Sequence, residues 1–392
     1  MVMLIAIDNG FQSCILAPTE ILANQHFKSL SELLIDYDVK VDLLTGSSKT
    51  RERNLIHSNL LSGKTNILVG THAILEDVVK FKNLGLSIID EQHRFGVAQR
   101  AKLWKKNNPA PHILVMTATP IPRTLAMSLY GDLDISYIKE LPPGRITTKT
   151  VHKYDRNRLS VFKFLKDQIN KGRQVYLVYP LINESEKLDY KDLMDGYESI
   201  VREFPRPDFQ VSIVHGKMKA KDKDYEMKRF INQETQILVS TTVIEVGVNV
   251  PNASVMVIES AERFGLSQLH QLRGRVGRGN DESYCVLMTK DKLSEDSKLR
   301  IETMVKVSDG FKLAEVDLKL RGPGDMLGTR QSGMLRFKLA DIVYDTEILN
   351  NARNSAIKLL KTDPRLNKNE NLPIRDEIST SSNSKNLWRY IS

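Results

Sequence analysis

The sequence predicts an α/β protein with two parallel sheets, each covered by helices, followed by a mostly helical C-terminal region. Short apolar runs alternate with longer amphipathic stretches, two prolines and a glycine at 142–144 interrupt this alternation, and the apolar runs end near residue 293. Apolar runs of this length are typical of strands buried on both faces, and such strands joined by helices form parallel sheets. We therefore expect domains over residues 1–141, 148–292 and 293–392.

The first domain should contain five strands. They are expected at Ser13–Ala17, Val41–Leu44, Asn66–Val69, Leu86–Ile89 and Ile113–Met116. The amphipathic stretches between them predict helices at Glu20–Leu34 and Lys49–Leu61. The first ten residues resemble the second half of an amphipathic helix.

The second domain repeats this plan. Strands are expected at Gln174–Val178, Val211–Val214, Gln236–Ser240, Ser254–Ile258 and Tyr284–Met288, and helices at Leu159–Asn170, Ala220–Ile231 and Leu266–Leu272. In the C-terminal region we expect helices at Lys298–Lys306 and Tyr344–Leu360. The glycine-rich stretch Leu318–Gly333 should be irregular, and the polar tail from Lys361 should be loose.

Charge, apolar runs and cysteine count limit the classes of protein to which this chain can belong. The chain has 57 Lys and Arg against 48 Asp and Glu, a net charge of +9, which suits a soluble basic protein or one that binds a polyanion such as nucleic acid. No run of about 18 apolar residues occurs, so we expect no membrane span. Cys14 and Cys285 are too few and too far apart for a disulfide scaffold or cysteine metal site, which fits a reducing cytoplasm.

Two carboxylates directly follow the strand expected at Leu86–Ile89. They are Asp90 and Glu91, and Gln92 and His93 come next. Ligands collect at the carboxyl ends of strands in open α/β sheets, where an aspartate can hold Mg²⁺ and a glutamate can orient water. Without the residues that follow, two solvated acids in a loop would be the commoner explanation.

A second motif interleaves arginines with glycines. It runs Gln271-Leu-Arg-Gly-Arg275-Val-Gly-Arg278-Gly279. Glycine lets a backbone approach closely, and the guanidinium fork fits phosphate oxygens, although a basic turn without a ligand is an equal alternative when the motif stands alone.

Hydroxyl residues, glycines and one proline follow several other strands, where such residues suit phosphates or a nucleic-acid backbone. These are Pro18, Thr19, Gly70, Thr71, Thr117, Thr119, Thr241, Thr242 and Gly247.

Taken in order, the segments APTEILANQH, VGTHAI, DEQHRFG, TATPIPRTLA, STTVIEVGVNVPNA and QLHQLRGRVGRG resemble the motifs of superfamily 2 helicases. Within that superfamily the chain resembles the RecG family of branched-DNA helicases from about residue 2 to about 360. The segment LRGPGDMLGTRQSG, with Arg321 and Arg330, resembles the translocation motif that RecG shares with the transcription-repair coupling factor. Asn249 departs from the family, which usually has aspartate there.

The resemblance implies two RecA-like helicase domains, ATP and Mg²⁺ as cofactors, and branched or duplex DNA as partner, with the protein acting as a monomer. Asp90 would hold Mg²⁺ and Glu91 would position water, while Gln271, Arg275 and Arg278 would face the triphosphate, Arg278 as the arginine finger. Gln92, His93, Thr117, Thr119 and Gly247 would couple the nucleotide site to DNA. Pro18, Thr19, Gly70, Thr71, Thr241 and Thr242 would touch the DNA backbone, and Arg321 and Arg330 would serve translocation.

An ATPase of this type needs a P-loop, G-x-x-x-x-G-K-[ST], and the sequence contains none. Ser62–Thr65 has the sequence SGKT, but a helix is expected before it and a strand after it, the reverse of a P-loop. Gly46–Thr50 lacks the second glycine, and Ser47 or Ser48 should instead cap the next helix. We expect that the chain begins just after the P-loop of a longer protein whose N-terminal wedge domain also precedes it.

Three alternatives remain at this stage. The transcription-repair coupling factor shares the translocation motif, and an RNA helicase shares the general motifs. A non-catalytic DNA-binding chain is favoured by the missing P-loop.

Overall fold

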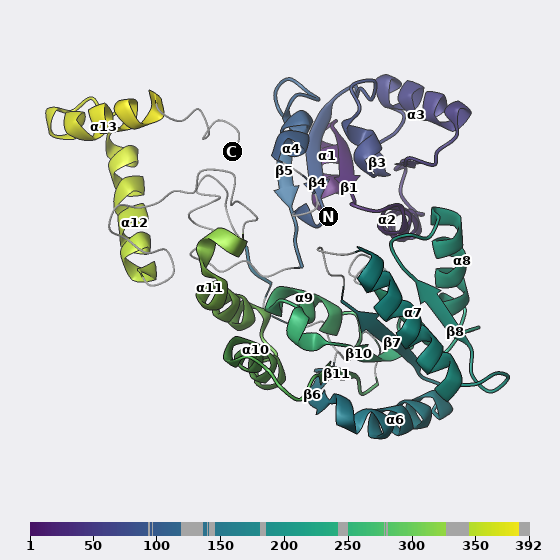
Figure 1. Cartoon of the computed structure of the whole chain (residues 1–392). Coiled ribbons are helices and arrows are strands. Elements are labelled where there is room, and N and C mark those ends of the chain that lie inside the picture. Colours follow the sequence, from purple (N-terminus) through teal and green to yellow (C-terminus); the bar gives the residue numbers. More distant parts are fainter. Residues whose placement is uncertain are drawn as a thin grey trace.

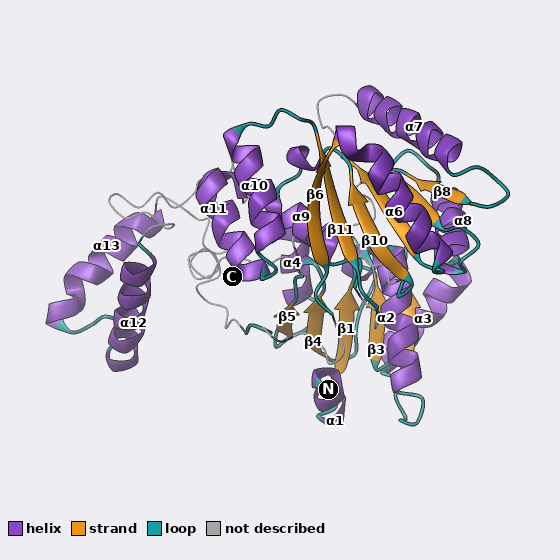
Figure 2. Ribbon diagram, turned by 90° about the horizontal axis from the view of Figure 1, so that it is seen from below, coloured by secondary structure: helices purple, strands orange, loops and turns teal. Residues whose placement is uncertain are grey.

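Two parallel β-sheets and a helical C-terminal region make up the computed structural model (Figure 1). It describes residues 1–92, 95, 97–118, 136–138, 140, 146–180, 186–241, 250–277, 279, 281–326 and 345–383. Figure 2 shows the two sheets as separate sets of strands with helices against them. The α/β fold class expected from the sequence is confirmed, and the domain limits stay a prediction.

The first sheet has the strand order β2-β3-β1-β4-β5, and all pairings are parallel. Its strands are β1 (Gln12–Leu16), β2 (Val41–Leu44), β3 (Ile67–Gly70), β4 (Leu84–Ile89) and β5 (His112–Val115). Its helices are α1 (Val2–Asp8), α2 (Glu20–Leu33), α3 (Thr50–Ser62), the 3₁₀ turn η1 (His72–Leu75) and α4 (Val97–Trp104). Each expected strand is present within about two residues.

The second sheet has the order β6-β11-β10-β7-β9-β8. Its strands are β6 (Lys149–Tyr154), β7 (Gln174–Tyr179), β8 (Val211–Val214), β9 (Ile237–Thr241), β10 (Ala253–Ile258) and β11 (Tyr284–Thr289). Its helices are α6 (Arg158–Asn170), α7 (Glu186–Glu203), α8 (Ala220–Ile231) and α9 (Leu266–Arg273), with short 3₁₀ turns η3 (Asp155–Asn157) and η5 (Ala261–Arg263). Strand β6 and helix α7 were not expected.

Both faces of each sheet are buried, as continuous apolar strands require. In β7, Tyr176 and Val178 belong to one core cluster, whereas Val175 and Leu177 belong to another. The same alternation along β1, β3 and β4 separates two clusters in the first sheet. Successive side chains of a strand point to opposite faces, so each sheet carries a core on either side.

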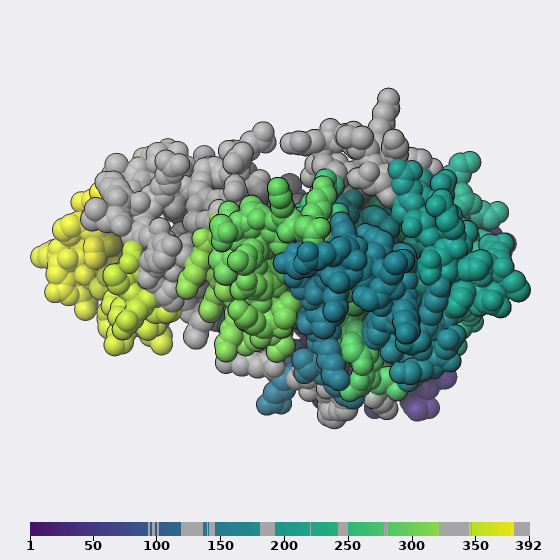
Figure 3. Space-filling view, turned by 60° about the horizontal axis from the view of Figure 1, so that its bottom comes forward, coloured from purple at the N-terminus to yellow at the C-terminus, as the bar shows by residue number. Residues whose placement is uncertain are grey.

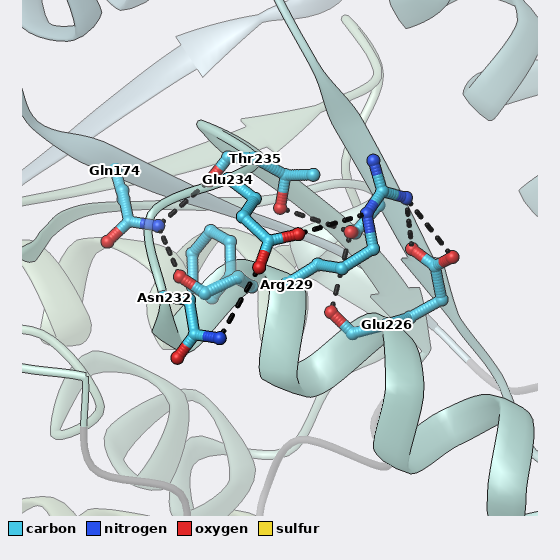
Figure 4. A network of polar contacts seen from close by, with 8 residues as sticks. Gln174, Glu226, Arg229, Asn232, Glu234 and Thr235 are labelled. Atoms are coloured by element: carbon cyan, nitrogen blue, oxygen red, sulfur yellow. Dashed lines mark hydrogen bonds and ion pairs between the residues drawn. The ribbon is translucent and has the colours of Figure 1, made fainter.

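In each sheet, a buried glutamine at the start of a central strand forms side-chain hydrogen bonds with the backbone of the neighbouring helix and strand. In the second sheet, Gln174 Nε2 donates to the carbonyl oxygens of Phe230 (2.6 Å) and Thr235 (2.8 Å), at the end of α8 and just before β9 (Figure 4). In the first, Gln12 Nε2 donates to those of Leu60 (3.0 Å) and Thr65 (2.7 Å), at the end of α3 and just before β3. The two domains therefore share these glutamine hydrogen bonds as well as the order of alternating strands and helices.

The C-terminal region contains α10 (Glu295–Lys306), α11 (Gly310–Met326), α12 (Thr346–Thr362), the 3₁₀ turn η6 (Asn369–Asn371) and α13 (Leu372–Asn383). Helix α11 packs on α9, whereas α12 and α13 project at one end of the molecule (Figures 1 and 3). Among the described residues, no helix is long and apolar enough to cross a bilayer.

Two expectations for this region are wrong. Residues 318–326 are helical because α11 is held by packing: Leu313 and Leu318 are buried, and Ser267 Oγ on α9 donates to Asp317 Oδ2 (2.9 Å). The tail is ordered in part, since α13 follows a turn in which Asp363 accepts hydrogen bonds from the amides of Asn367 (3.0 Å) and Lys368 (2.9 Å). These contacts and the Asn371 side chain hold the pKa of Asp363 below its usual range, Asn371 contributing most.

Candidate nucleotide and nucleic-acid site

The carboxyl ends of the first sheet's strands lie along one edge, joined by backbone hydrogen bonds. The amide of Ala17 donates to the carbonyl of Gly70 (2.9 Å), and that of Asp90 donates to the last carbonyl of β1 (2.9 Å). The amide of Met116 donates to the last carbonyl of β4 (2.8 Å). The motifs that follow β3, β1, β4 and β5 are therefore neighbours along this edge.

Glu91 contacts the threonine motif that follows β5. Its Oε2 accepts a weak hydrogen bond from Thr117 Oγ1 (3.5 Å) and one from the amide of Ala118 (3.3 Å). The amide of Gln92 donates to the carbonyl of Met116 (3.3 Å). Glu91 is 8% exposed and has φ +51°, an unfavourable region for a residue other than glycine. Backbone strain of this kind is typical of functional sites.

Asp90 is held from a different direction. His26 Nε2, on α2, lies 2.9 Å from Asp90 Oδ2, and both side chains are partly exposed. The sequence interpretation missed His26, although it stands at the end of the quoted segment APTEILANQH. Its position two helical turns after Thr19 was the available signal, because residues i and i+7 share one helix face.

The acidic edge fits Mg²⁺ held jointly with a nucleotide. The described residues contain no group of three or more His, Cys, Asp or Glu side chains able to hold a metal ion by themselves. Mg²⁺ at phosphate-handling sites is usually bound through one or two carboxylates, with phosphates and water completing the shell. Asp90 suits this arrangement, since His26 contacts only its Oδ2.

The neighbouring part of the edge carries the residues expected to touch DNA. Thr19 caps α2, its Oγ1 accepting from the amide of Leu22 (3.3 Å), and Pro18 is half-buried beside it. Thr71 is 8% exposed, and its amide donates to the carbonyl of Leu44 (3.2 Å). A Cβ on Gly70 would lie 2.1 Å from that same carbonyl oxygen, so only glycine fits there.

Three of the residues expected to act from the second domain are among the described residues. Thr241 ends β9, is 2% exposed, and its Oγ1 has no hydrogen-bond partner among the described residues. Gln271 lies half-buried on α9, and Arg275 is 7% exposed just after that helix. The roles expected for them stay predictions.

Arg273, the first arginine of the glycine-arginine motif, has a structural position instead. It is 6% exposed and donates to the carbonyl oxygens of Met304 (3.1 Å), Val307 (2.9 Å) and Ser308 (3.0 Å) at the end of α10. Burial lowers the pKa of its guanidinium. The alternation of arginine and glycine in the sequence did not distinguish this anchor from its neighbours.

Several expected site residues lie outside the described residues. These are His93, Thr119, Thr242, Gly247, Arg278 and Arg330, together with Asn249. Arg321 lies on α11, but nothing is described of its side chain.

Neither P-loop-like segment has P-loop geometry. Ser62–Thr65 joins the end of α3 to β3, with Gly63 as a left-handed C-cap at φ +78°, as expected. The expectation that Ser47 or Ser48 caps α3 is wrong. Lys49 holds the N-cap position, its amide donates to Glu52 (3.3 Å), and Ser47 instead donates to Glu20 through its amide (2.9 Å) and its hydroxyl (3.0 Å).

Both cysteines are buried and free, as their positions in apolar strands suggested. Burial raises the pKa of the Cys14 thiol to about 11 and that of Cys285 to about 12. Thiols with pKa values this high are poor nucleophiles and poor metal ligands at neutral pH.

The chain matches three protein families in succession. Residues 1–128 match the DEAD/DEAH box helicases, residues 160–280 the helicase conserved C-terminal domain, and residues 307–392 the C-terminal part of domain 3 of ATP-dependent DNA helicase RecG.

Curated relatives named ATP-dependent DNA helicase RecG extend the match. The Synechocystis sp. protein is 50% identical over 95% of this chain, the Aquifex aeolicus protein 51% over 93%, and the Bacillus subtilis protein 49% over 96%. The chain covers 44%, 46% and 55% of these relatives, so it spans about half their length.

Solved structures agree with this. A RecG bound to a three-way DNA junction superposes with a TM-score of 0.71 at 42% identity, over 89% of this chain and 45% of that one. The L327V variant of Dbp5 from S. cerevisiae, bound to RNA and ADP BeF3, gives a TM-score of 0.55 at 15% identity over 90% of this chain and 84% of that one, which shows a shared fold alone. Both helicase matches and the RecG-specific C-terminal match thus lie in order along the chain, which is similar to RecG proteins over almost its whole length.

Proposed function

We propose that this chain carries the motor of an ATP-driven translocase that remodels branched DNA, such as stalled forks and Holliday junctions, in recombination and repair. One observation carries the proposal: Asp90 and Glu91 lie on the same sheet edge as Thr19 and Thr71, so groups suited to a nucleotide and groups suited to a DNA backbone adjoin. The match to a RecG solved on a three-way junction supports branched DNA as the substrate.

The proposed roles follow the chemistry of each group. ATP would supply the bond whose hydrolysis drives movement, and Mg²⁺ would neutralise charge on its phosphates. Asp90 would hold the ion and Glu91, fixed by Thr117, would orient the attacking water. Gln271, Arg275 and Arg278 would act on the triphosphate from the second domain.

DNA would be bound through its backbone. Pro18, Thr19, Gly70, Thr71, Thr241 and Thr242 would contact phosphates and sugars. Gln92, His93, Thr119 and Gly247 would couple this surface to the nucleotide, and Arg321 and Arg330 would convert domain movement into translocation. We further propose that the protein acts as a monomer in the cytoplasm.

The test uses a version of the chain joined to the P-loop segment of a RecG relative. Arg278→Ala should cut DNA-stimulated ATP turnover by about 10³ or more, because arginine fingers stabilise charge that develops in the transition state. The Kd for ATP should change far less. An equal loss of binding and turnover would show that Arg278 is no finger.

One other function has a specific observation in its favour. The 392 residues contain no P-loop, and Ser62–Thr65 is a helix-to-strand turn. The chain by itself would then be a DNA-binding unit without ATPase activity, and the ATP turnover of the unextended chain distinguishes the two.

A further inference from the structure

We infer that His26 is a positioning residue that links the DNA-facing start of α2 to the carboxylate of Asp90. The inference rests on the proposed function, and it assigns a role to a side chain outside the helicase motif residues assigned above. It depends on three features: the His26–Asp90 contact, the course of α2, and the separate support of Glu91.

The contact is specific in its geometry. His26 Nε2 lies 2.9 Å from Asp90 Oδ2, a normal length for a hydrogen bond. Because an ionised carboxylate only accepts hydrogen bonds, His26 Nε2 is the donor of this pair. The two side chains are 26% and 19% exposed, so water is only partly excluded from the pair. A histidine that fixes one oxygen of a carboxylate leaves the other oriented toward its ligand, as outer partners of metal sites do.

Helix α2 connects the His26–Asp90 contact to Thr19, one of the residues proposed to touch DNA. Its N-cap is Thr19, a proposed DNA contact, and His26 is seven residues further on, about 10 Å along the axis at 1.5 Å per residue. Residues seven apart lie on the same helix face. Leu22 and Ala23, between them, are buried in the core cluster on this face of the sheet, so a displacement at Thr19 would be carried along one continuous helix to His26.

The neighbouring carboxylate depends on a different element. Glu91 is held by Thr117 and Ala118, after β5, and not by α2. A shift of α2 on DNA binding would therefore move Asp90 relative to Glu91. In this way DNA at Thr19 would adjust the metal-side carboxylate while leaving the water-positioning carboxylate in place.

The experiment is ¹⁵N NMR of the 392-residue chain with labelled histidine, at one fixed pH. The chain has eight histidines, and the His26 signals are identified by their loss in His26→Gln. Asp90→Asn should shift the His26 Nε2 signal and leave the other histidines in place. Asp8→Asn, at the exposed end of α1, is the matched control and should shift none of the eight.

Duplex DNA is then added, with binding followed on the same samples by fluorescence anisotropy. We expect the His26 signal to shift as DNA saturates the protein. If DNA binds and His26 does not respond, the coupling is wrong while the proposed DNA-binding function stands. If DNA does not bind, the proposed function fails and the coupling fails with it.

The pair itself is tested without DNA. Should Asp90→Asn leave the His26 signal unchanged, the contact is absent in solution and the inference is overturned. If Asp90→Asn fails to fold, Asp90→Glu keeps the charge and displaces the carboxylate by one methylene, and it should shift the same signal.

Rescue by a conservative variant separates positioning from packing. In the version joined to a P-loop segment, His26→Leu should lower DNA-stimulated kcat by about 10- to 100-fold, with a smaller change in the KM for ATP, as loss of an outer partner of a metal ligand does. His26→Gln retains an amide donor and should recover much of the rate. Equal rates in the two variants would show that His26 serves packing alone.

Discussion

Arg273, the first arginine of the glycine-arginine motif, makes structural contacts. Its side chain is buried, and its guanidinium donates hydrogen bonds to three carbonyl oxygens at the end of α10. The last carbonyls of a helix have no partner within the helix, so a buried helix end needs such a donor. Because its guanidinium is occupied by these carbonyl oxygens, the first arginine of the motif stabilises the fold and does not bind a phosphate.

Arg273→Met should therefore destabilise the protein. Methionine fills much of the same volume but leaves buried carbonyls without donors, which costs about 1–3 kcal/mol. Chemical denaturation monitored by circular dichroism measures the change. Arg202→Met, at an exposed position on α7, is the matched control and should have little effect. A neutral Arg273→Met would mean that the anchor contributes nothing to folding.

Gly70 determines how closely β2 and β3 approach at the end of the first sheet. With a Cβ there the nearest atom would be a backbone oxygen 2.1 Å away, and a backbone oxygen cannot rotate aside as a flexible side chain can. Gly70→Ala should cost about 1–3 kcal/mol through overpacking and should also weaken DNA binding, since Thr71 follows directly.

Gly216→Ala is the matched control for this substitution. A Cβ at Gly216 would have no atom within 4 Å, so thermal unfolding should change little. If the two variants had equal stability, the close approach of β2 and β3 would not be a real constraint.

At the scale of the element, buried strands were predictable and edge elements were not. Continuous apolar runs identified β7 and β10 because burial on both faces leaves little choice of residue. Strand β6 was missed because Lys149–Tyr154 lies at the sheet edge with alternating exposure and reads as a polar segment. In α11, the glycines and proline of LRGPGDM indicated a loop, whereas packing on α9 keeps the backbone helical.

The candidate site was predictable in part for the same reason. Strand-end motifs are local in sequence, so Glu91, Thr117 and Thr71 could be named before the fold was known. The contact between Glu91 and Thr117, and the approach of His26 to Asp90, join residues 26 and 64 positions apart. No local pattern encodes such a pairing.

For the whole molecule, the net charge of +9 and the hydroxyl residues at the strand ends predict DNA binding without base recognition. Affinity for duplex DNA should fall log-linearly with salt concentration, by about 10³ or more between 50 and 200 mM if six or more phosphates are contacted. Fluorescence anisotropy with duplexes of different sequence measures both trends. A strong preference for one base sequence at fixed salt would contradict this mode of binding.

The unextended chain should not hydrolyse ATP at a helicase-like rate, although it has both sheets and, on the proposed function, should still bind DNA. Phosphoryl transfer of this kind depends on positioning and on charge neutralisation. The sequence keeps Asp90, the carboxylate proposed to hold Mg²⁺, and Arg278, the proposed finger, but it has no P-loop lysine or amide cradle to place the β- and γ-phosphates between them. An arginine finger worth about 10³–10⁵ contributes little to a phosphate that is not held in register.

The measurement is DNA-stimulated phosphate release by the 392-residue chain beside the version joined to a P-loop segment. Lys64→Ala is the decisive variant, because Lys64 follows the left-handed Gly63 in the turn between α3 and β3, where no helix follows to bind a phosphate at its N-terminus. It should change neither rate. If the unextended chain matched the extended one and Lys64→Ala abolished its activity, Ser62–Thr65 would be a nucleotide-binding loop after all, and its helix-to-strand geometry would have to rearrange when ATP binds.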